Sequence, residues 1–237
     1  MSALLAETPD VLALDKPAGV SMATSSRPGS AEEAVRRLLA ACRVEARDPL
    51  PKLVHRLDVG TTGVVLLAKS DAAHRALSRA LQQGAARKTY RALVWGHPVP
   101  ARGRVDLALA RDPKDGRKMR VARDGKPSVT NYETLGRLSA LAELRLAPET
   151  GRTHQIRVHL SAKGHPIAGD DFYGGATRWR GIKDAALRAA LRRLARPLLH
   201  AERIVIPEME IDVSAPLPGD YEEILASLSA ASVLRPT

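Results

Sequence analysis

One carboxylate stands out by its position in the chain. Asp58 follows His55 and Arg56 on a turn rich in glycine and threonine, just before the apolar run 64–68. That run is too short for a helix but suits a buried strand, and a strand end is where sites are built. The basic neighbours Lys52, His55 and Arg56 predict that Asp58 is ionised at neutral pH. Such a carboxylate is a nucleophile or a salt-bridge partner, unless it only accepts backbone hydrogen bonds in its own turn.

The segments on either side predict the elements that position this carboxylate. Short apolar runs bounded by Gly and Pro predict strands at residues 11–14, 64–68, 87–95, 105–109, 129–134, 141–146, 203–206 and 209–213. Helical spacing of apolar residues predicts helices that begin at Ser30, Ser70, after Glu149, at Ile182 and at Asp220. Glu33 and Glu223 complete capping boxes with Ser30 and Asp220. We therefore expect a single α+β domain with a mostly antiparallel mixed β-sheet, flanked by helices and basic loops.

The charge balance predicts the kind of partner. The chain has 37 Lys and Arg residues against 26 Asp and Glu, a formal net charge of +11, while 44% of its residues are hydrophobic. A folded protein this basic is expected to bind a polyanion, and nucleic acid is the first candidate. Aromatic residues make up only 3%, so recognition should depend more on arginine and shape than on stacking.

A polar stretch between the predicted strands 105–109 and 129–134 concentrates positive charge. We call it the basic segment, and its basic residues are Arg111, Lys114, Arg117, Lys118, Arg120, Arg123 and Lys126. Such a ribbon of cations suits a phosphate backbone. The alternative is a solvated hairpin with no ligand.

Several classes of protein fit the sequence poorly. Cys42 is the only cysteine, which excludes an intrachain disulfide and a cysteine-based zinc site. Residues 1–6 do not have the charged and apolar regions of a signal peptide, and we expect a cytoplasmic protein without a membrane span. On one helix His154 and His159 diverge by about 140° and cannot grip one metal from one face. This spacing argues against a zincin-like metal site.

Five sequence blocks carry a resemblance to a known family. They are Asp15-Lys-Pro-Ala-Gly19, then His55-Arg-Leu-Asp58 with Thr62-Gly63 and Ala68-Lys69, then Lys88-Thr-Tyr90, then Gly151-Arg-Thr-His-Gln-Ile-Arg-Val-His159 with Gly164-His-Pro-Ile167 and Gly169-Asp170, and Leu199-His-Ala201. In order and spacing they resemble the RluA-type RNA pseudouridine synthases, which isomerise uridine to pseudouridine in ribosomal or transfer RNA. The likeness covers about residues 9–215. One block alone is a weak signal, whereas five in order are a strong one.

The resemblance implies the fold and the catalytic residues. We expect the pseudouridine synthase catalytic fold, with Asp58 as the catalytic aspartate. Tyr90 is expected to stack on the flipped uracil and to handle a ring proton. Arg157 is expected to pair with Asp58, with a purely structural ion pair as its alternative.

The resemblance also implies a set of RNA-contacting residues. Arg56 should hold the flipped-out position in the RNA, His55 should support the loop, and Leu199 should pack beside the base. The fourth block adds Arg152, His154 and Gln155 as RNA-binding residues. The chemistry that the resemblance implies requires no metal or organic cofactor.

Two departures from the family pattern affect the organisation of the chain. Many relatives place an S4-type RNA-binding domain before the catalytic domain, whereas here the Asp15 motif begins almost at the N-terminus. We therefore expect residues 1–237 to form one catalytic domain with no S4 domain. Residues 22–29 replace a histidine-containing extension, and no role is assigned to them. We expect a monomer with RNA as its partner and no obligate protein partner.

Two other functional classes remain open at this point. One is a non-catalytic RNA-binding or ribosome-assembly protein on the same fold, although binding alone does not require Asp58, Tyr90 and Arg157 together. The other is a metal-dependent hydrolase that uses the chain's histidines with Asp170 and Asp171. Its weakness is spacing, because no two of these histidines have the helical i,i+4 arrangement.

Overall fold

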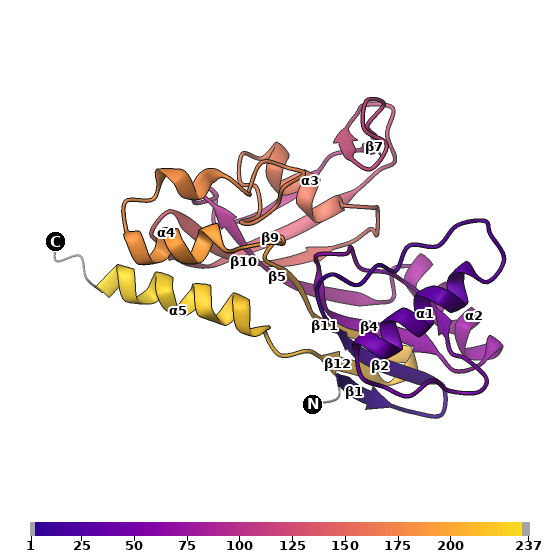
Figure 1. The fold of residues 1–237 in the computed structure, drawn as a ribbon. Coiled ribbons are helices and arrows are strands. Elements are labelled where there is room, and N and C mark those ends of the chain that lie inside the picture. Colours follow the sequence, from indigo (N-terminus) through magenta and orange to yellow (C-terminus); the bar gives the residue numbers. More distant parts are fainter. Residues whose placement is uncertain (1–2, 234–237) are drawn as a thin grey trace. The chain divides into compact units, whose positions relative to one another are not determined.

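The computed structural model describes residues 3–233, which form two compact units. The first unit contains the chain up to Lys88 together with Ala201–Pro216, and the second contains Thr89–His200 together with the residues from Leu217 onward. Figure 1 shows the elements of both units along the chain. No helix among the described residues is long and apolar enough to cross a membrane. The expectation of a single catalytic domain stays a prediction.

The first unit is built on an antiparallel sheet. Its strands lie in the order β1 (Leu4–Glu7), β2 (Val11–Lys16), β4 (Thr62–Ala68) and β11 (Leu199–Ile206), and β11 begins in the second unit. Strand β3 (Lys52–Leu53) pairs with β4, and β12 (Ile211–Ser214) pairs with β11 after the 3-10 turn η2 (Pro207–Met209). Two helices belong to this unit, α1 (Ser30–Ala41) and α2 (Asp71–Gln82).

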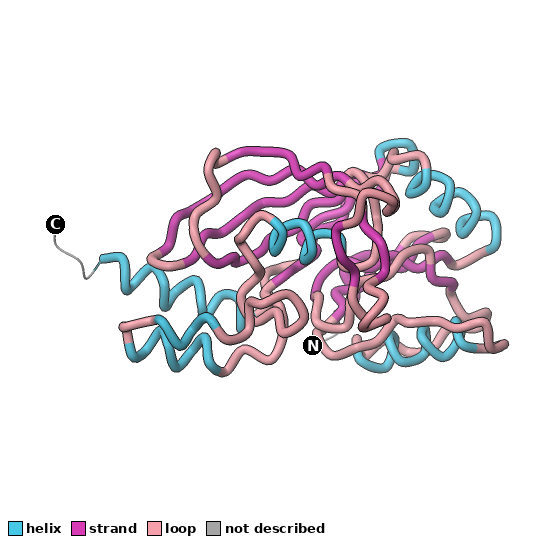
Figure 2. Tube along the Cα trace, turned by 90° about the horizontal axis from the view of Figure 1, so that it is seen from above, coloured by secondary structure: helices cyan, strands magenta, loops and turns pink. Residues whose placement is uncertain are grey.

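Strand β4 is the centre of the first unit's core. All seven of its residues are buried, so both faces of the sheet are covered there. Val64 and Leu66 pack in one cluster with Leu77 of α2. Successive strand residues point to opposite faces, which leaves the buried Val65 and Leu67 for the other face. Figure 2 shows helices on both sides of the strands of this unit.

A glycine allows the backbones of β4 and β11 to approach closely. Gly63 has a φ of 109°, and a Cβ built on it would lie 2.2 Å from the carbonyl oxygen of Ala201. No other residue type fits that approach without moving one of the strands.

The second unit has its own antiparallel sheet. The strands lie in the order β5 (Arg87–Trp95), β10 (Leu141–Pro148), β9 (Val129–Leu138) and β6 (Arg102–Asp106), and β5 begins in the first unit. A separate hairpin consists of β7 (Leu109–Arg111) and β8 (Met119–Val121). The helices are α3 (Gln155–Ala162), α4 (Ala185–Arg192) and α5 (Gly219–Val233), with the 3-10 turn η1 (Arg178–Gly181) before α4.

Alternate residues of β5 belong to two separate apolar clusters. Leu93 and Trp95 pack with residues of α4 and α5, including the fully buried Tyr221. Ala92 and Val94 pack in a second cluster with residues of β10 and α3. The alternation is that of a strand covered on both faces, as in β4.

The predicted α+β class with a mostly antiparallel sheet is confirmed. The strand pairs of each unit described above are antiparallel, and helices accompany both sheets. Most predicted strands and helices are present with shifted ends. The predicted strand 105–109 is wrong, because its residues are divided between β6 and the hairpin strand β7. Strand β1 was not predicted.

Both predicted capping boxes are wrong. Helix α1 begins after Gly29, and the hydroxyl of Ser30 donates to the carbonyl of Ser25 instead of capping the helix. Asp220 lies inside the first turn of α5, where its carboxylate accepts two hydrogen bonds from Arg196. Helix α4 also begins later than Ile182, after an aspartate cap at Asp184.

Candidate functional site

Asp58 lies in the loop that joins β3 to β4. Its backbone carbonyl accepts a hydrogen bond from the N–H of Thr61, and its side chain is partly buried. Leu57 is buried beside it and fixes the loop on the core of the first unit. Lys52, one of the three basic neighbours in the sequence, forms an exposed ion pair with Asp71. The structure therefore directs this lysine to the surface of α2.

The loop's conformation depends on the buried side chain of Lys16. Its ammonium group donates to the carbonyl oxygens of Pro17 at 3.0 Å, Val59 at 3.3 Å and Thr61 at 2.9 Å. The N–H of Gly19 donates to the Val59 carbonyl as well, at 2.8 Å. One cation from the end of β2 thus binds carbonyl oxygens within and just after the Asp58–Gly60 turn. Sequence reasoning assigned no role to Lys16, although the Asp15-Lys-Pro-Ala-Gly19 block was its signal.

His55 fixes the beginning of the same loop to β4. Its Nε2 accepts a hydrogen bond from the N–H of Leu66 at 3.0 Å, which requires a ring nitrogen without a proton. Burial lowers the pKa of His55 to about 4, and the positive charge of Lys88 adds to this effect. The imidazole is therefore neutral at physiological pH. Support of the loop, the role expected of His55, agrees with this geometry.

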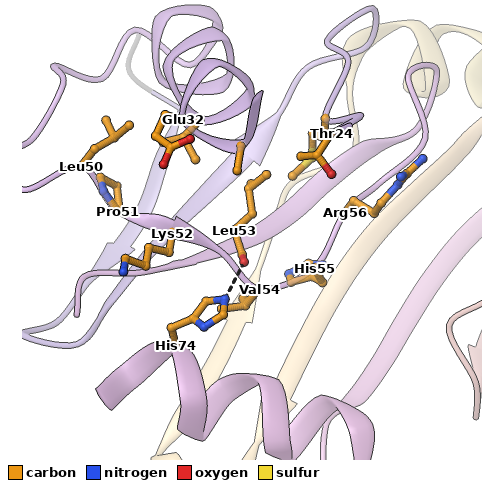
Figure 3. Close-up of a pocket in the computed structure, with 13 residues that line it drawn as sticks. Thr24, Glu32, Leu50, Pro51, Lys52, Leu53, Val54, His55, Arg56 and His74 are labelled. Carbon is orange, nitrogen blue, oxygen red and sulfur yellow. Dashed lines mark hydrogen bonds between the residues drawn. The ribbon is translucent and has the colours of Figure 1, made fainter. Parts of the chain in front are cut away.

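A pocket of about 590 Å³ lies behind the loop (Figure 3). Its lining includes His55 and Arg56 together with Met22 and Thr24 from the segment to which the sequence assigned no role. Met22 is almost completely buried, so this segment contributes to the wall of the pocket. Arg56 is exposed, as an RNA-contacting arginine needs to be.

In the second unit the structure brings Tyr90 and Leu199 together. Both belong to the apolar cluster that includes Ile156 of α3. Leu199 is buried, whereas Tyr90 is only partly buried at the edge of the cluster. A partly exposed ring beside a buried leucine is a surface on which a flat base can stack.

Arg157 is fixed by a buried carboxylate. Its Nε donates to Oδ2 of Asp170 at 2.7 Å and its second terminal nitrogen to Oδ1 at 2.9 Å. Oδ1 also accepts from the backbone N–H groups of Phe172 and Tyr173. Asp170 thereby orients the guanidinium in a bidentate pair, a role that sequence reasoning missed. Asp58 belongs to the first unit and Arg157 to the second, and their pairing stays a prediction.

The three remaining predicted RNA contacts surround the start of α3. Arg152 is exposed, and its Nε donates to the carbonyl of Pro127 at 3.4 Å. His154 has a left-handed φ of 54°, and its Nδ1 lies 2.7 Å from the Tyr173 hydroxyl. Their contact with RNA stays a prediction.

Gln155 is buried and is engaged within the protein. Its side-chain oxygen accepts from Thr150 and from the N–H of Arg152, and its nitrogen donates to Val129 and Thr130. These contacts close the loop 149–155 onto β9. They give Gln155 a structural role, whereas the RNA contact predicted for it is untested.

Comparison with known proteins shows the family. Residues 10–162, more than half of the chain, match the model of the RNA pseudouridylate synthase family. The dual-specificity RNA pseudouridine synthase RluA of Escherichia coli K12 is 37% identical over 222 residues, which cover 92% of this chain and 93% of that protein. The chain belongs to the RluA-type RNA pseudouridine synthases.

Other relatives agree with this membership. The ribosomal large subunit pseudouridine synthase D of Pseudomonas aeruginosa is 36% identical over 94% of this chain and 70% of its own. Two solved human structures, RNA pseudouridylate synthase domain containing 1 and 4, superpose with TM-scores of 0.70 and 0.73 at 26% and 25% identity. Each comparison covers 96% of this chain.

One of the histidines considered above as a metal ligand has both ring nitrogens engaged within the protein. His159 is fully buried, and its two ring nitrogens bond to the Thr130 hydroxyl and the Leu107 carbonyl. Within residues 3–233, no three or more His, Cys, Asp or Glu side chains are grouped to hold a metal ion. Asp58 lies within the matched region, and its role as the catalytic aspartate stays a prediction.

Replacing Lys16 tests how far the loop depends on its ammonium group. Lys16→Met removes the donor from three carbonyl oxygens, and we expect the free energy of unfolding to fall by about 3 kcal/mol. Pseudouridine formation should slow at least about tenfold, because the loop can shift. Lys52→Met, which removes only an exposed ion pair, should cost less than about 1 kcal/mol. Urea unfolding measures both variants, and equal losses would contradict the role of Lys16.

His55 predicts a pH dependence of stability. Because its folded pKa lies near 4 and an unfolded histidine has a pKa of about 6.5, the unfolded chain binds the extra proton first as pH falls. Stability should therefore be full above pH 6.5 and fall by up to about 3 kcal/mol toward pH 4. His55→Gln keeps an acceptor for Leu66 N–H and should have a smaller fall. Urea midpoints at pH 7 and pH 4.5 test this, and identical pH dependences would refute it.

Proposed function

We propose that this protein isomerises specific uridines of ribosomal or transfer RNA to pseudouridine, with Asp58 as the catalytic aspartate. The observation that carries the proposal is the family match across residues 10–162, a range that includes Asp58. Hydrogen bonds from Lys16 and to His55 hold the loop in which Asp58 lies. One relative is a dual-specificity RNA pseudouridine synthase and another a ribosomal large subunit pseudouridine synthase, which supports RNA, and ribosomal RNA in particular, as the substrate. The protein acts as a monomer in the cytoplasm.

The reaction moves a glycosidic bond from N1 to C5 of the same uracil. Asp58 either attacks C1′ and forms an ester, or removes a proton from C2′ so that a glycal forms. In both routes the uracil leaves with the electron pair of the N1–C1′ bond and rotates while it is retained. C5 then bonds to C1′ as the Asp58 ester bond breaks or, in the glycal route, as Asp58 returns its proton to C2′. Finally C5 loses its proton and N1 gains one.

The other site residues have roles that follow from their surroundings. Tyr90 and Leu199 form the surface on which the uracil stacks, and Tyr90 handles the proton at the ring. Arg157, oriented by Asp170, pairs with Asp58 and keeps it ionised. Arg56 takes the place of the uridine in the RNA stack. Extrusion of the nucleotide costs a few kcal/mol, which contacts of cations with phosphates offset.

Removing the carboxylate charge tests the catalytic role directly. Asp58→Asn should slow pseudouridine formation at least about 10³-fold, because an amide neither attacks C1′ nor accepts the C2′ proton. The melting temperature and RNA affinity should remain close to those of the wild type. Asp71→Asn, on the exposed side of α2, is the matched control and should keep full activity. Turnover retained in Asp58→Asn would exclude this residue as the nucleophile.

The substrate is identified by mapping pseudouridines in cells with and without the gene. Carbodiimide-based sequencing of total RNA should show one or more sites lost on deletion. The wild-type gene should restore these sites and the Asp58→Asn gene should not. If deletion leaves every site intact, the non-catalytic RNA-binding class becomes the better description.

A second substitution separates stacking from proton transfer at Tyr90. Tyr90→Phe keeps the ring and its contact with the Leu199 cluster but removes the hydroxyl. Because general acid–base catalysis contributes about 10²–10⁴-fold, we expect the rate at saturating RNA to fall at least about a hundredfold with unchanged RNA affinity. Single-turnover rates measure this. A rate equal to that of the wild type would assign stacking alone to Tyr90.

A further inference from the structure

The hydroxyl of Tyr173 connects the hairpin β7–β8 to the start of α3. The N–H of Met119, in β8, donates to this hydroxyl at 2.9 Å, and Nδ1 of His154 lies 2.7 Å from it. Since a backbone N–H can only donate, the hydroxyl accepts from Met119, and the same oxygen shares a second hydrogen bond with the His154 ring nitrogen. One side-chain oxygen therefore bonds to two segments that are 35 residues apart in the chain.

The backbone and the ring of Tyr173 contact Asp170, Ser161 and Arg157. Its N–H donates to Oδ1 of Asp170, the carboxylate that orients Arg157, and its carbonyl accepts from the hydroxyl of Ser161. The guanidinium of Arg157 lies 5.1 Å from the centre of its ring. The ring is thus part of the support of Arg157, whereas the hydroxyl reaches away to the hairpin.

The hairpin depends on contacts outside itself. It is a two-stranded sheet with three residue pairs, Leu109↔Val121, Ala110↔Arg120 and Arg111↔Met119. An isolated hairpin of this kind is marginally stable at best in water. Arg117 and Lys118, in the turn, lie over the ring of Phe172 at 5.6 Å and 5.5 Å. The hairpin therefore contacts the rest of the unit through Phe172 and Tyr173.

We propose that Tyr173 is a positioning residue, whose hydroxyl fixes the basic hairpin against the start of α3 so that its cations are ordered before RNA binds. The proposal rests on the proposed function, because it takes RNA as the ligand of the hairpin. Five of the seven basic side chains of the basic segment lie in β7, β8 and their turn, namely Arg111, Lys114, Arg117, Lys118 and Arg120. Ordering them in advance removes an entropic cost from RNA binding.

Tyr173→Phe is the informative substitution, because it keeps the ring over Arg157 and removes both hydroxyl bonds. Tyr132→Phe, in β9 of the same unit, is the matched control. It also removes a tyrosine hydroxyl that forms a hydrogen bond, since the Tyr132 hydroxyl donates to the Pro100 carbonyl at 3.2 Å. In RNA-free protein, the amide of Met119 should exchange with solvent at least about fivefold faster in Tyr173→Phe and at the wild-type rate in Tyr132→Phe. This measurement, by NMR, does not depend on any activity.

Kinetics then test the consequence for RNA. With the transcript that the wild type modifies, Tyr173→Phe should raise KM at least about fivefold and leave kcat within about twofold, whereas Tyr132→Phe should change neither. An unchanged Met119 exchange rate would overturn the proposal. So would faster exchange with an unchanged KM, or a fall in kcat alone, which would place the role of the hydroxyl at Arg157. If the wild type makes no pseudouridine, the proposed function fails, and filter binding of unmodified tRNA and rRNA transcripts replaces KM as the test.

Discussion

The arrangement of the first unit's part of the site depends on one buried ammonium group. Lys16 has no exposed surface, and it donates to the carbonyl oxygens of Val59 and Thr61, within and just after the turn that carries Asp58. Burying a charge is unfavourable unless polar groups replace its water, and here backbone carbonyls do so. The exchange makes the turn rigid, because a shift of Val59 or Thr61 would take a hydrogen-bond acceptor away from the buried cation. A carboxylate that must meet one atom of a flipped nucleotide needs such a support.

The second unit uses the same physical device with the opposite charge. Asp170 is completely buried and accepts hydrogen bonds from Arg157 and from two backbone N–H groups of the loop that follows. A buried bidentate pair allows the guanidinium little rotation. Each unit thus fixes a functional side chain through a buried ion with several backbone partners. The stability of the fold is therefore sensitive to substitutions at these contacts, since removing one partner of a buried ion commonly costs several kcal/mol.

Much of this structure could be predicted from the sequence, and the reasons for the rest are local. Periodicity located β4, β5 and α2, because apolar runs and the Ser70 cap determine these elements by themselves. The capping boxes failed because Ser30 and Asp220 found tertiary partners, Ser25 and Arg196, that compete with local capping. Motif spacing predicted roles for Asp58, Tyr90 and Arg157, which stay predictions, but it gave no sign that Lys16 and Asp170 support the site. A buried ion and its carbonyl or guanidinium partners come together only in the fold, and no spacing rule along the chain describes them.

The single cysteine gives the molecule a simple chemical property. Cys42, next to the end of α1, is buried, and its thiol lies 3.5 Å from the carbonyl of Asp15. Burial and the charge of Asp15 raise the pKa of this thiol to about 11, so it stays protonated and is a poor nucleophile in the folded protein. Alkylating reagents should modify it only when the region around Asp15 opens. The native protein therefore contains its own reporter of local unfolding beneath the Asp15 block. A second cysteine introduced on the surface would react with a fluorescent label while Cys42 stays unlabelled.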